Sequence, residues 1–142
     1  VQYARRGKLD RIGQGVYRLT HYLSTEYDSY AEAIALVGPG AFLWGESVIA
    51  LLGLAPTNPA NLHVASPQRS RKKLPPFIKV EKAKSGYKPT YYEGIPSQRV
   101  PDAIRACRGK MMGNRLRDAT GKAHSQGFVS ASEKQALLEE LA

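Results

Sequence analysis

The chain changes its hydrophobic periodicity along its length, and this change limits the folds that it can adopt. Residues 24–52 place apolar side chains at the spacing that is typical of amphipathic helices. Residues 61–95 instead alternate apolar and polar side chains in short runs, as strands do. Helical spacing returns after residue 97. Helices on both sides of a block of strands predict an α+β fold, with a small mixed sheet packed against helices.

The first helical block is predicted to contain two helices. The first runs over residues 24–37 and ends at Gly38, and the second runs over residues 41–52 and ends at Gly53. Possible N-caps of the first helix are Ser24, Thr25 and Asp28. Neither helix carries a lysine or an arginine. Both are therefore expected to belong to the core of the main domain.

Strands and further helices are predicted downstream. The strands cover residues 61–66, 77–83 and 89–95. Ser97 is expected to cap the next helix, and a longer helix is predicted over residues 110–126. The expected buried stripe of the longer helix consists of Met112, Leu116, Ala119 and Ala123. The spacing of Ser130 and Glu133 predicts a capping box that opens a last helix.

The segment GKLDRIGQGVYRL, residues 7–19, predicts a basic β-hairpin near the start of the chain. Its strands are expected over residues 8–12 and 15–19, joined by a two-residue II′ turn at Gly13-Gln14. A plain edge hairpin is the alternative to a functional one. Residues 1–6 are typical of a helix end, so we expect the natural N-terminus to lie upstream and the chain to be a fragment.

The net charge of +9 is unevenly distributed. Residues 1–20 carry five basic side chains and one acidic one, whereas residues 21–65 carry four acidic side chains and no lysine or arginine. Residues 66–90 carry eight basic side chains and one acidic one, and residues 99–124 carry seven and two. This segregation predicts one or two basic faces and an anionic partner, most often nucleic acid or an acidic membrane surface.

Motifs for catalysis or metal binding are sparse, and we predict no enzyme activity, no cofactor and no metal. His21, His63 and His124 have no second ligand at metal spacing, so surface or structural roles are expected. Cys107 is the only cysteine, which excludes an intrachain disulfide and favours the reducing cytoplasm. Its basic neighbours favour a lowered pKa, although an inert thiol is the better hypothesis. Ser47 is expected to be a small packing residue.

Basic and aromatic side chains are the remaining positive signal. Lysine and arginine pair with phosphate oxygens, and tyrosine donates a hydrogen bond to them. The predicted DNA-binding residues of the hairpin region are Arg5, Arg6, Lys8, Arg11, Gln14, Tyr17 and Arg18. Those of the proline-bounded loop between the first two predicted strands are Arg69, Arg71, Lys72 and Lys73. For the loop, a solvated charge run is an equally good interpretation.

The order of these motifs resembles a known family. RRGKLDRIGQGVYRL resembles the wing of a winged helix-turn-helix domain, and more narrowly the corresponding segment of AbiEi-type antitoxins. The positions that match this pattern are Arg11, Gly15, Val16 and Tyr17. GAFLWGESVIALLGL and YYEGIPSQRVPDAIRAC are similar to a helix of the family and to its strand, Gly-Ile-Pro and helix. The paired strands around a basic loop and the terminal helical bundle extend the resemblance over most of the chain.

The resemblance implies an antitoxin that represses its own operon by binding promoter DNA and that counteracts a nucleotidyltransferase-like toxin. Residues 1–20 are then the remnant of a winged-helix DNA-binding domain, and residues 21–142 are an antitoxin-like domain with a C-terminal helical bundle. The helices that precede the wing in the family, including most of the recognition helix, are missing from this sequence. Contacts to phosphate are therefore expected without base specificity. The alternatives are a nuclease-like nucleic-acid enzyme and a pure protein-interaction module.

Overall fold

The computed structural model describes residues 27–57, 60–68 and 73–142, and the backbone of two short strands before them. Those strands are β1, Leu9–Arg11, and β2, Tyr17–Leu19, which pair antiparallel with Arg11 opposite Tyr17. Paired strands are thus present where the sequence predicts them, within the expected ranges. The predicted turn at Gly13-Gln14 lies outside the described residues.

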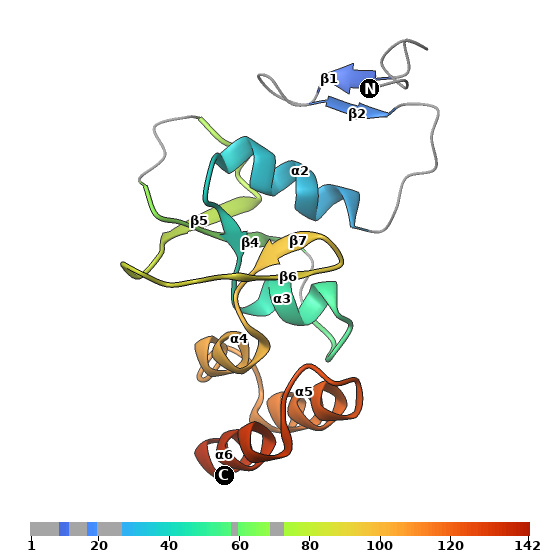
Figure 1. Ribbon diagram of the computed structural model, residues 1–142, viewed down its shortest axis with the longest axis vertical. Helices are drawn as coiled ribbons and strands as arrows, with labels where there is room; N and C mark the ends of the chain where they lie inside the picture. The colour runs from blue at the N-terminus through green and yellow to red at the C-terminus, as the bar shows by residue number, and fades with distance from the viewer. Residues whose placement is uncertain (1–8, 12–16, 20–26, 58–59, 69–72) are drawn as a thin grey trace.

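A five-stranded mixed sheet forms the centre of the fold, which confirms the predicted α+β class (Figure 1). Its strands are β3, Phe42–Leu43; β4, Leu62–Ser66; β5, Ile78–Lys82; β6, Thr90–Tyr92; and β7, Ile95–Ser97. The order across the sheet is β5-β4-β3-β7-β6. Strand β3 is antiparallel to β4 and parallel to β7, β4 and β5 are parallel, and β6 and β7 are antiparallel.

The predicted strands are present, but the third is a hairpin of two. Residues 61–66 and 77–83 contain β4 and β5 as expected. Within residues 89–95 the chain turns at Glu93 and Gly94, which have φ angles of 53° and 76°. Two successive residues with positive φ are typical of a tight hairpin turn. This turn ends β6 and precedes β7, a strand that the sequence pattern does not predict.

The predicted helix over residues 41–52 is wrong in its first part. Phe42 and Leu43 form strand β3, and the helix α3 covers only Glu46–Leu51. Gly45 lies between the two elements with a φ of +57°, which is incompatible with a continuous right-handed helix. Leu43 is fully buried in the middle of the sheet. A buried apolar side chain is compatible with a strand as well as with a helix, so the pattern does not distinguish the two.

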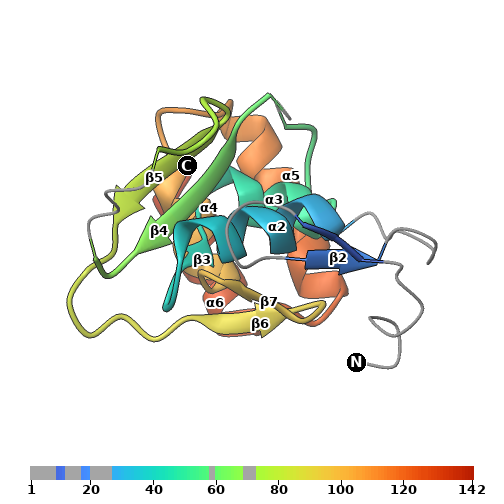
Figure 2. The same cartoon turned by 90° about the horizontal axis from the view of Figure 1, so that it is seen from above.

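Helices cover both sides of the sheet (Figures 1 and 2). The helices besides α3 are α2, Asp28–Val37; α4, Val100–Ala106; α5, Gly113–Ser125; and α6, Ala131–Glu140. Helix α2 packs across β3, β4 and β7 on one side. On the other side α3 packs on α4, α4 on α5, and α5 on α6, so the helices lead away from the sheet in sequence order.

Helix ends confirm some predicted caps and correct others. The Ser130 side chain accepts a hydrogen bond from the Glu133 backbone N–H, and the Glu133 side chain accepts one from the Ser130 N–H, which is the predicted capping box. Ser97 does not cap a helix, because it is buried in β7 and donates its hydroxyl to the Ile95 carbonyl. Met112 is 61% exposed because it precedes α5 as its N-cap instead of lying on the buried stripe.

One further correction concerns α2. Its N-cap is Tyr27, which makes no side-chain capping bond, and Asp28 lies in the first turn. The other two predicted caps, Ser24 and Thr25, lie outside the described residues. An acidic side chain in a first turn still stabilises the helix through its dipole.

We predict that residues 21–142 fold without the hairpin. Most of the buried hydrophobic residues that the structure describes form one cluster between Ala33 and Leu137, which joins the sheet to the helices. A hairpin of two short strands contributes little stability by itself. Expressed alone, residues 21–142 should unfold in one cooperative transition, with a urea midpoint close to that of the whole chain. A broad transition would show instead that residues 1–20 complete the core.

Candidate nucleic-acid interface

Most of the predicted DNA-binding residues lie outside the described part of the chain. These are Arg5, Arg6, Lys8, Gln14, Arg69, Arg71 and Lys72. For Arg11, Tyr17 and Arg18 the structure gives only backbone positions in the paired strands. Lys73 is described and exposed. The two predicted groups of DNA-binding residues therefore stay predictions.

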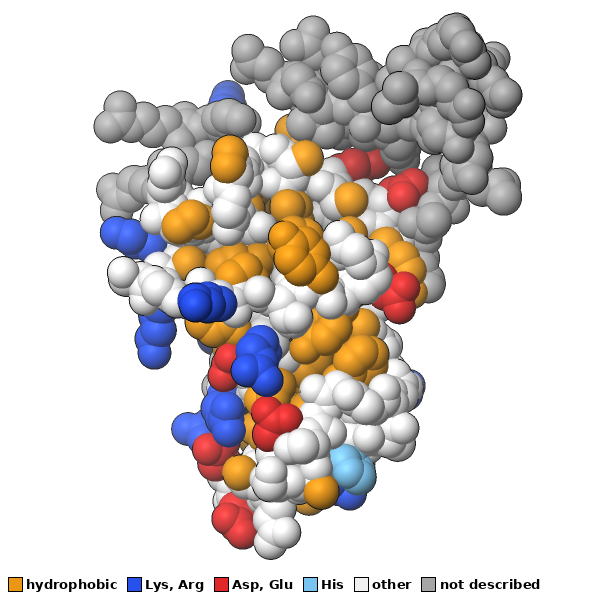
Figure 3. Space-filling model, viewed as in Figure 1, with side chains coloured by type: hydrophobic (Ala, Val, Ile, Leu, Met, Phe, Trp, Pro, Cys, Tyr) orange, Lys and Arg blue, Asp and Glu red, His pale blue; other side chains and the backbone are white. Residues whose placement is uncertain are grey.

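The described residues add lysines to this set. Strand β5 and the loop that follows it carry the exposed side chains of Lys79, Lys82, Lys84 and Lys88. None of the four forms an ion pair within the described ranges. Figure 3 shows basic side chains along the flank of the molecule that β5 and α4 occupy. Exposed lysines without an acidic partner are available to an anion.

A groove of about 700 Å³ lies between the sheet and α4. Phe42, Ala65 and Glu81 are aligned across β3, β4 and β5, so the sheet presents them on one face as the floor. The walls consist of Trp44, Lys82, Ala83, Lys84, Tyr87, Gln98, Asp102, Arg105 and Ala106. Residues of three strands, of the loop after β5 and of α4 thus meet at this groove, although they are far apart in the sequence.

Tyr87 fixes the loop that forms one wall of the groove. Its ring stacks on Phe42 with a centroid distance of 5.4 Å and an interplanar angle of 19°. Its hydroxyl donates to Asp102 Oδ2 at 2.8 Å and accepts from the Arg99 backbone N–H at 2.9 Å. Burial, reinforced by Asp102, raises the pKa of Tyr87 to about 12. The loop after β5 is therefore tied to the start of α4, and the groove is preformed.

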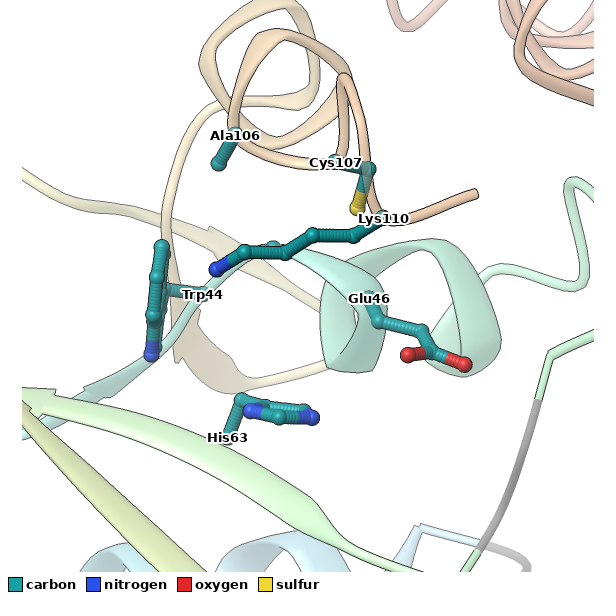
Figure 4. Close-up of a pocket in the computed structure, with 7 residues that line it drawn as sticks. Trp44, Glu46, His63, Ala106, Cys107 and Lys110 are labelled. Carbon is teal, nitrogen blue, oxygen red and sulfur yellow. The ribbon is translucent and has the colours of Figure 1, made fainter. Parts of the chain in front are cut away.

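Trp44 separates the groove from a smaller pocket. That pocket has about 30 Å³ and is lined by Trp44, Gly45, Glu46, His63, Ala106, Cys107 and Lys110 (Figure 4). Lys110 extends across it and places Nζ 5.1 Å from the centroid of the Trp44 ring, a cation–π contact. His63 packs edge-on against Trp44 at a centroid distance of 6.3 Å. The pocket has room for a water molecule and not for a substrate.

The indole nitrogen Nε1 of Trp44 is buried without a hydrogen bond to any described residue. An unmade hydrogen bond of this kind costs about 1–3 kcal/mol.

The surroundings of Cys107 agree with the prediction of an inert thiol. The thiol is only 2% exposed, and burial raises its pKa to about 12. Glu46 raises the pKa further, and Lys110 opposes this shift. The pKa lowering that basic neighbours favour is thus present only as the effect of Lys110, and burial of the thiol outweighs it. Cys107 is a packing residue.

The other candidates for chemistry have structural surroundings. Ser47 is buried and accepts a hydrogen bond from the His63 backbone N–H at 2.7 Å, which confirms its packing role. His63 and His124 are both half-buried, and His21 lies outside the described residues. Within the described ranges, no three His, Cys, Asp or Glu side chains are grouped so that they can hold a metal ion.

No local pattern in the sequence indicates the groove. Trp44 falls within the predicted helix over residues 41–52, and Tyr87 lies between two predicted strands. The lysines at positions 79, 82 and 84 form a visible signal, because they fall within six residues at the end of the predicted strand over residues 77–83 and just beyond it. The convergence of Lys82 and Lys84 with Trp44 and α4 depends on the sheet order, which no local pattern contains.

No model of a known protein family matches this chain, and no curated protein matches it. The likeness to AbiEi-type antitoxins therefore depends on the motifs quoted from the sequence. A search of the described helices finds none that is long and apolar enough to cross a membrane.

Replacing Tyr87 by Phe tests the tie between the loop and α4. The substitution keeps the ring that stacks on Phe42 and removes the hydroxyl that joins Asp102 to the Arg99 N–H. We expect the free energy of unfolding to fall by about 1–3 kcal/mol, because both partners lose a hydrogen bond. Tyr91→Phe is the matched control, since the Tyr91 side chain is 68% exposed. Equal stability of the two variants would contradict the tie.

The raised pKa of Cys107 predicts a loss of stability in alkali. The unfolded thiol has the ordinary pKa of 9.0, whereas the folded one has a pKa of about 12. The unfolded state therefore loses its proton first, and the free energy of unfolding falls as the pH rises from 9 to 12. Urea titrations at pH 8 and pH 10.5 should show this fall. Cys107→Ala should reduce the difference between the two titrations, and an unchanged difference would exclude the thiol as its source.

Proposed function

We propose that this chain is part of a DNA-binding antitoxin that represses its own toxin–antitoxin operon and counteracts a nucleotidyltransferase-like toxin. The observation that carries the proposal is the order of the motifs. A basic hairpin precedes an α+β domain, and the quoted segments resemble AbiEi-type antitoxins from that hairpin to the last helix. Two antiparallel strands at the position of the expected wing are consistent with this order.

Electrostatics support a polyanionic partner. The net charge is +9, and the basic residues are concentrated in residues 1–20, 66–90 and 99–124. In the described part of the second segment, the lysines of β5 and its following loop are exposed and have no acidic partner. Promoter DNA, with its phosphates regularly spaced, is the partner that this distribution of charge fits best.

Two parts of the chain have different proposed functions. Residues 1–20 contact DNA phosphates through Arg11, Arg18 and their neighbours, and Tyr17 donates a hydrogen bond. Residues 21–142 neutralise the toxin. Base readout is assigned to the recognition helix of the winged-helix domain, and the hairpin contributes affinity for duplex DNA with little sequence preference.

The proposed activity is binding in the cytoplasm and not catalysis. A nuclease-like enzyme is the competing hypothesis, and it has a direct test. Labelled DNA and RNA are incubated with the chain and Mg²⁺, and cleavage above that of a mock preparation would favour the nuclease and contradict the antitoxin.

We predict that the chain binds duplex DNA with a steep dependence on salt. Each neutralised phosphate contributes roughly 0.9 to the slope of log affinity against log salt. With a handful of phosphate contacts, fluorescence anisotropy between 50 and 200 mM salt should give a slope of several units. A flat response would contradict electrostatic recognition.

The substitutions Arg11→Ala and Arg18→Ala test whether the hairpin contacts the DNA. In the full-length protein, each should reduce the salt slope by roughly one unit and weaken operator and random duplexes equally, because phosphate contacts carry no sequence information. Lys134→Ala is the control, since Lys134 lies in the net acidic segment 125–142. A loss of operator preference without a loss of affinity for random DNA would assign base readout to the hairpin.

A further inference from the structure

We propose that the groove between the sheet and α4 binds a nucleotide, with the base against Trp44 and the phosphate at Lys82 and Lys84. All three residues line this groove. The site is separate from the hairpin, and it does not depend on operator binding or on the antitoxin function. The ligand chemistry is a planar base linked to phosphate, either as a free nucleotide or as an unpaired nucleotide within a strand.

The size and rigidity of the groove suit a small ligand. Its volume of about 700 Å³ falls within the range of ordinary ligand sites. The stack of Tyr87 on Phe42 and the hydrogen bond from Tyr87 to Asp102 hold two walls together. A preformed groove loses little conformational entropy when a ligand binds.

Trp44 provides the surface on which a base can stack. It follows strand β3 directly, and its backbone N–H donates to the His63 carbonyl, which anchors it to the sheet. On the side of the smaller pocket, the Trp44 ring is held by the cation–π contact with Lys110 and by the edge contact with His63. The ring also borders the groove, so a positioned aromatic surface is already in place. Stacking of a base on such a ring is tolerant of base identity.

The charges of the groove leave an excess for phosphate. Of its two carboxylates, Asp102 accepts the Tyr87 hydroxyl and faces Arg105 at 3.5 Å. Arg105 is also bound by Glu140 at 2.9 Å, so it is not available to a ligand. Glu81 is exposed. Lys82 and Lys84 have no ion-pair partner within the described residues, and together they outweigh the single carboxylate that remains.

A nucleotide fits these features better than an acidic peptide does. A peptide carboxylate satisfies the two lysines and leaves Trp44 without a planar partner. A nucleotide presents a base and a phosphate a few ångströms apart. The base can stack on Trp44 while the phosphate contacts the lysines of the same groove. The experiment below therefore distinguishes an acidic peptide from a nucleotide as the ligand of the groove.

The chain contains a single tryptophan, so its fluorescence reports on the groove directly. The whole chain is titrated with AMP, ATP, adenosine, ribose 5-phosphate and inorganic phosphate, and separately with single-stranded oligonucleotides of dT and dA. We expect strong quenching by nucleotides, weak quenching by adenosine and none by ribose 5-phosphate or phosphate. Isothermal calorimetry gives the dissociation constants.

Two double variants test the position of the phosphate. Lys82→Gln with Lys84→Gln should weaken nucleotide binding roughly tenfold, since two charged contacts are lost. Lys79→Gln with Lys88→Gln is the matched control, because both side chains are exposed on the same segment and neither lines the groove. The control should bind within twofold of the unaltered chain. Each double variant loses two positive charges, so the two variants have the same net charge. A difference in binding between them therefore cannot come from overall electrostatics.

The outcomes separate the sources of the nucleotide. Quenching by AMP identifies a free nucleotide as sufficient, and quenching only by oligonucleotides identifies an unpaired nucleotide in a strand. Either result supports the proposal if the groove variant is weaker than the control. Absence of quenching and of calorimetric binding by all nucleotides overturns it, as does equal loss in the two variants. Binding of a glutamate-rich peptide, with no binding of nucleotides, would assign the groove to an acidic protein. Duplex binding by the hairpin is measured separately and does not affect these results.

Discussion

The pairing of strand β3 with both of its neighbours is the interaction on which the rest of the structure depends. This strand has only two residues, yet it joins β4 on one side and β7 on the other. The Trp44 N–H donates to the His63 carbonyl at 3.1 Å, and the Gln98 N–H donates to the Leu43 carbonyl at 2.7 Å. Without β3 the sheet would separate into two unconnected pairs of strands, each too small to be stable.

The position of β3 also explains how the groove is assembled. Phe42 projects from the strand to support Tyr87, and Trp44 follows at its end as the next wall. Tyr87 in turn ties the loop after β5 to α4 through Asp102 and the Arg99 N–H. A chain of contacts thus runs from the central strand to the first helix of the C-terminal group. The same contacts keep Lys82 and Lys84 near an aromatic surface.

Charge and burial divide this molecule into regions with different roles. The part of the chain that forms α2, β3 and α3 has no lysine or arginine between residues 21 and 65, and it provides much of the core. Basic side chains are concentrated instead on β5, its following loop and the region around α4 and α5. The one thiol is inside this core, where burial makes it inert. Recognition of an anion is therefore possible without exposing the core.

Local sequence determined the fold class, most of the helices, the strands β4, β5 and β6, and the capping box at Ser130, because each depends on periodicity or on side chains a few residues apart. It also determined the order of the motifs, which carries the proposed function, and the segregation of charge that supports it. The assignment of Phe42 and Leu43 to a strand was decided only by the tertiary structure, since apolar residues are compatible with either element until neighbouring strands supply hydrogen bonds. The burial of Cys107 and the convergence of Trp44, Tyr87 and Lys82 were likewise decided by the sheet order. Residues separated by tens of positions meet because β3 lies between β4 and β7, and no local pattern specifies that arrangement.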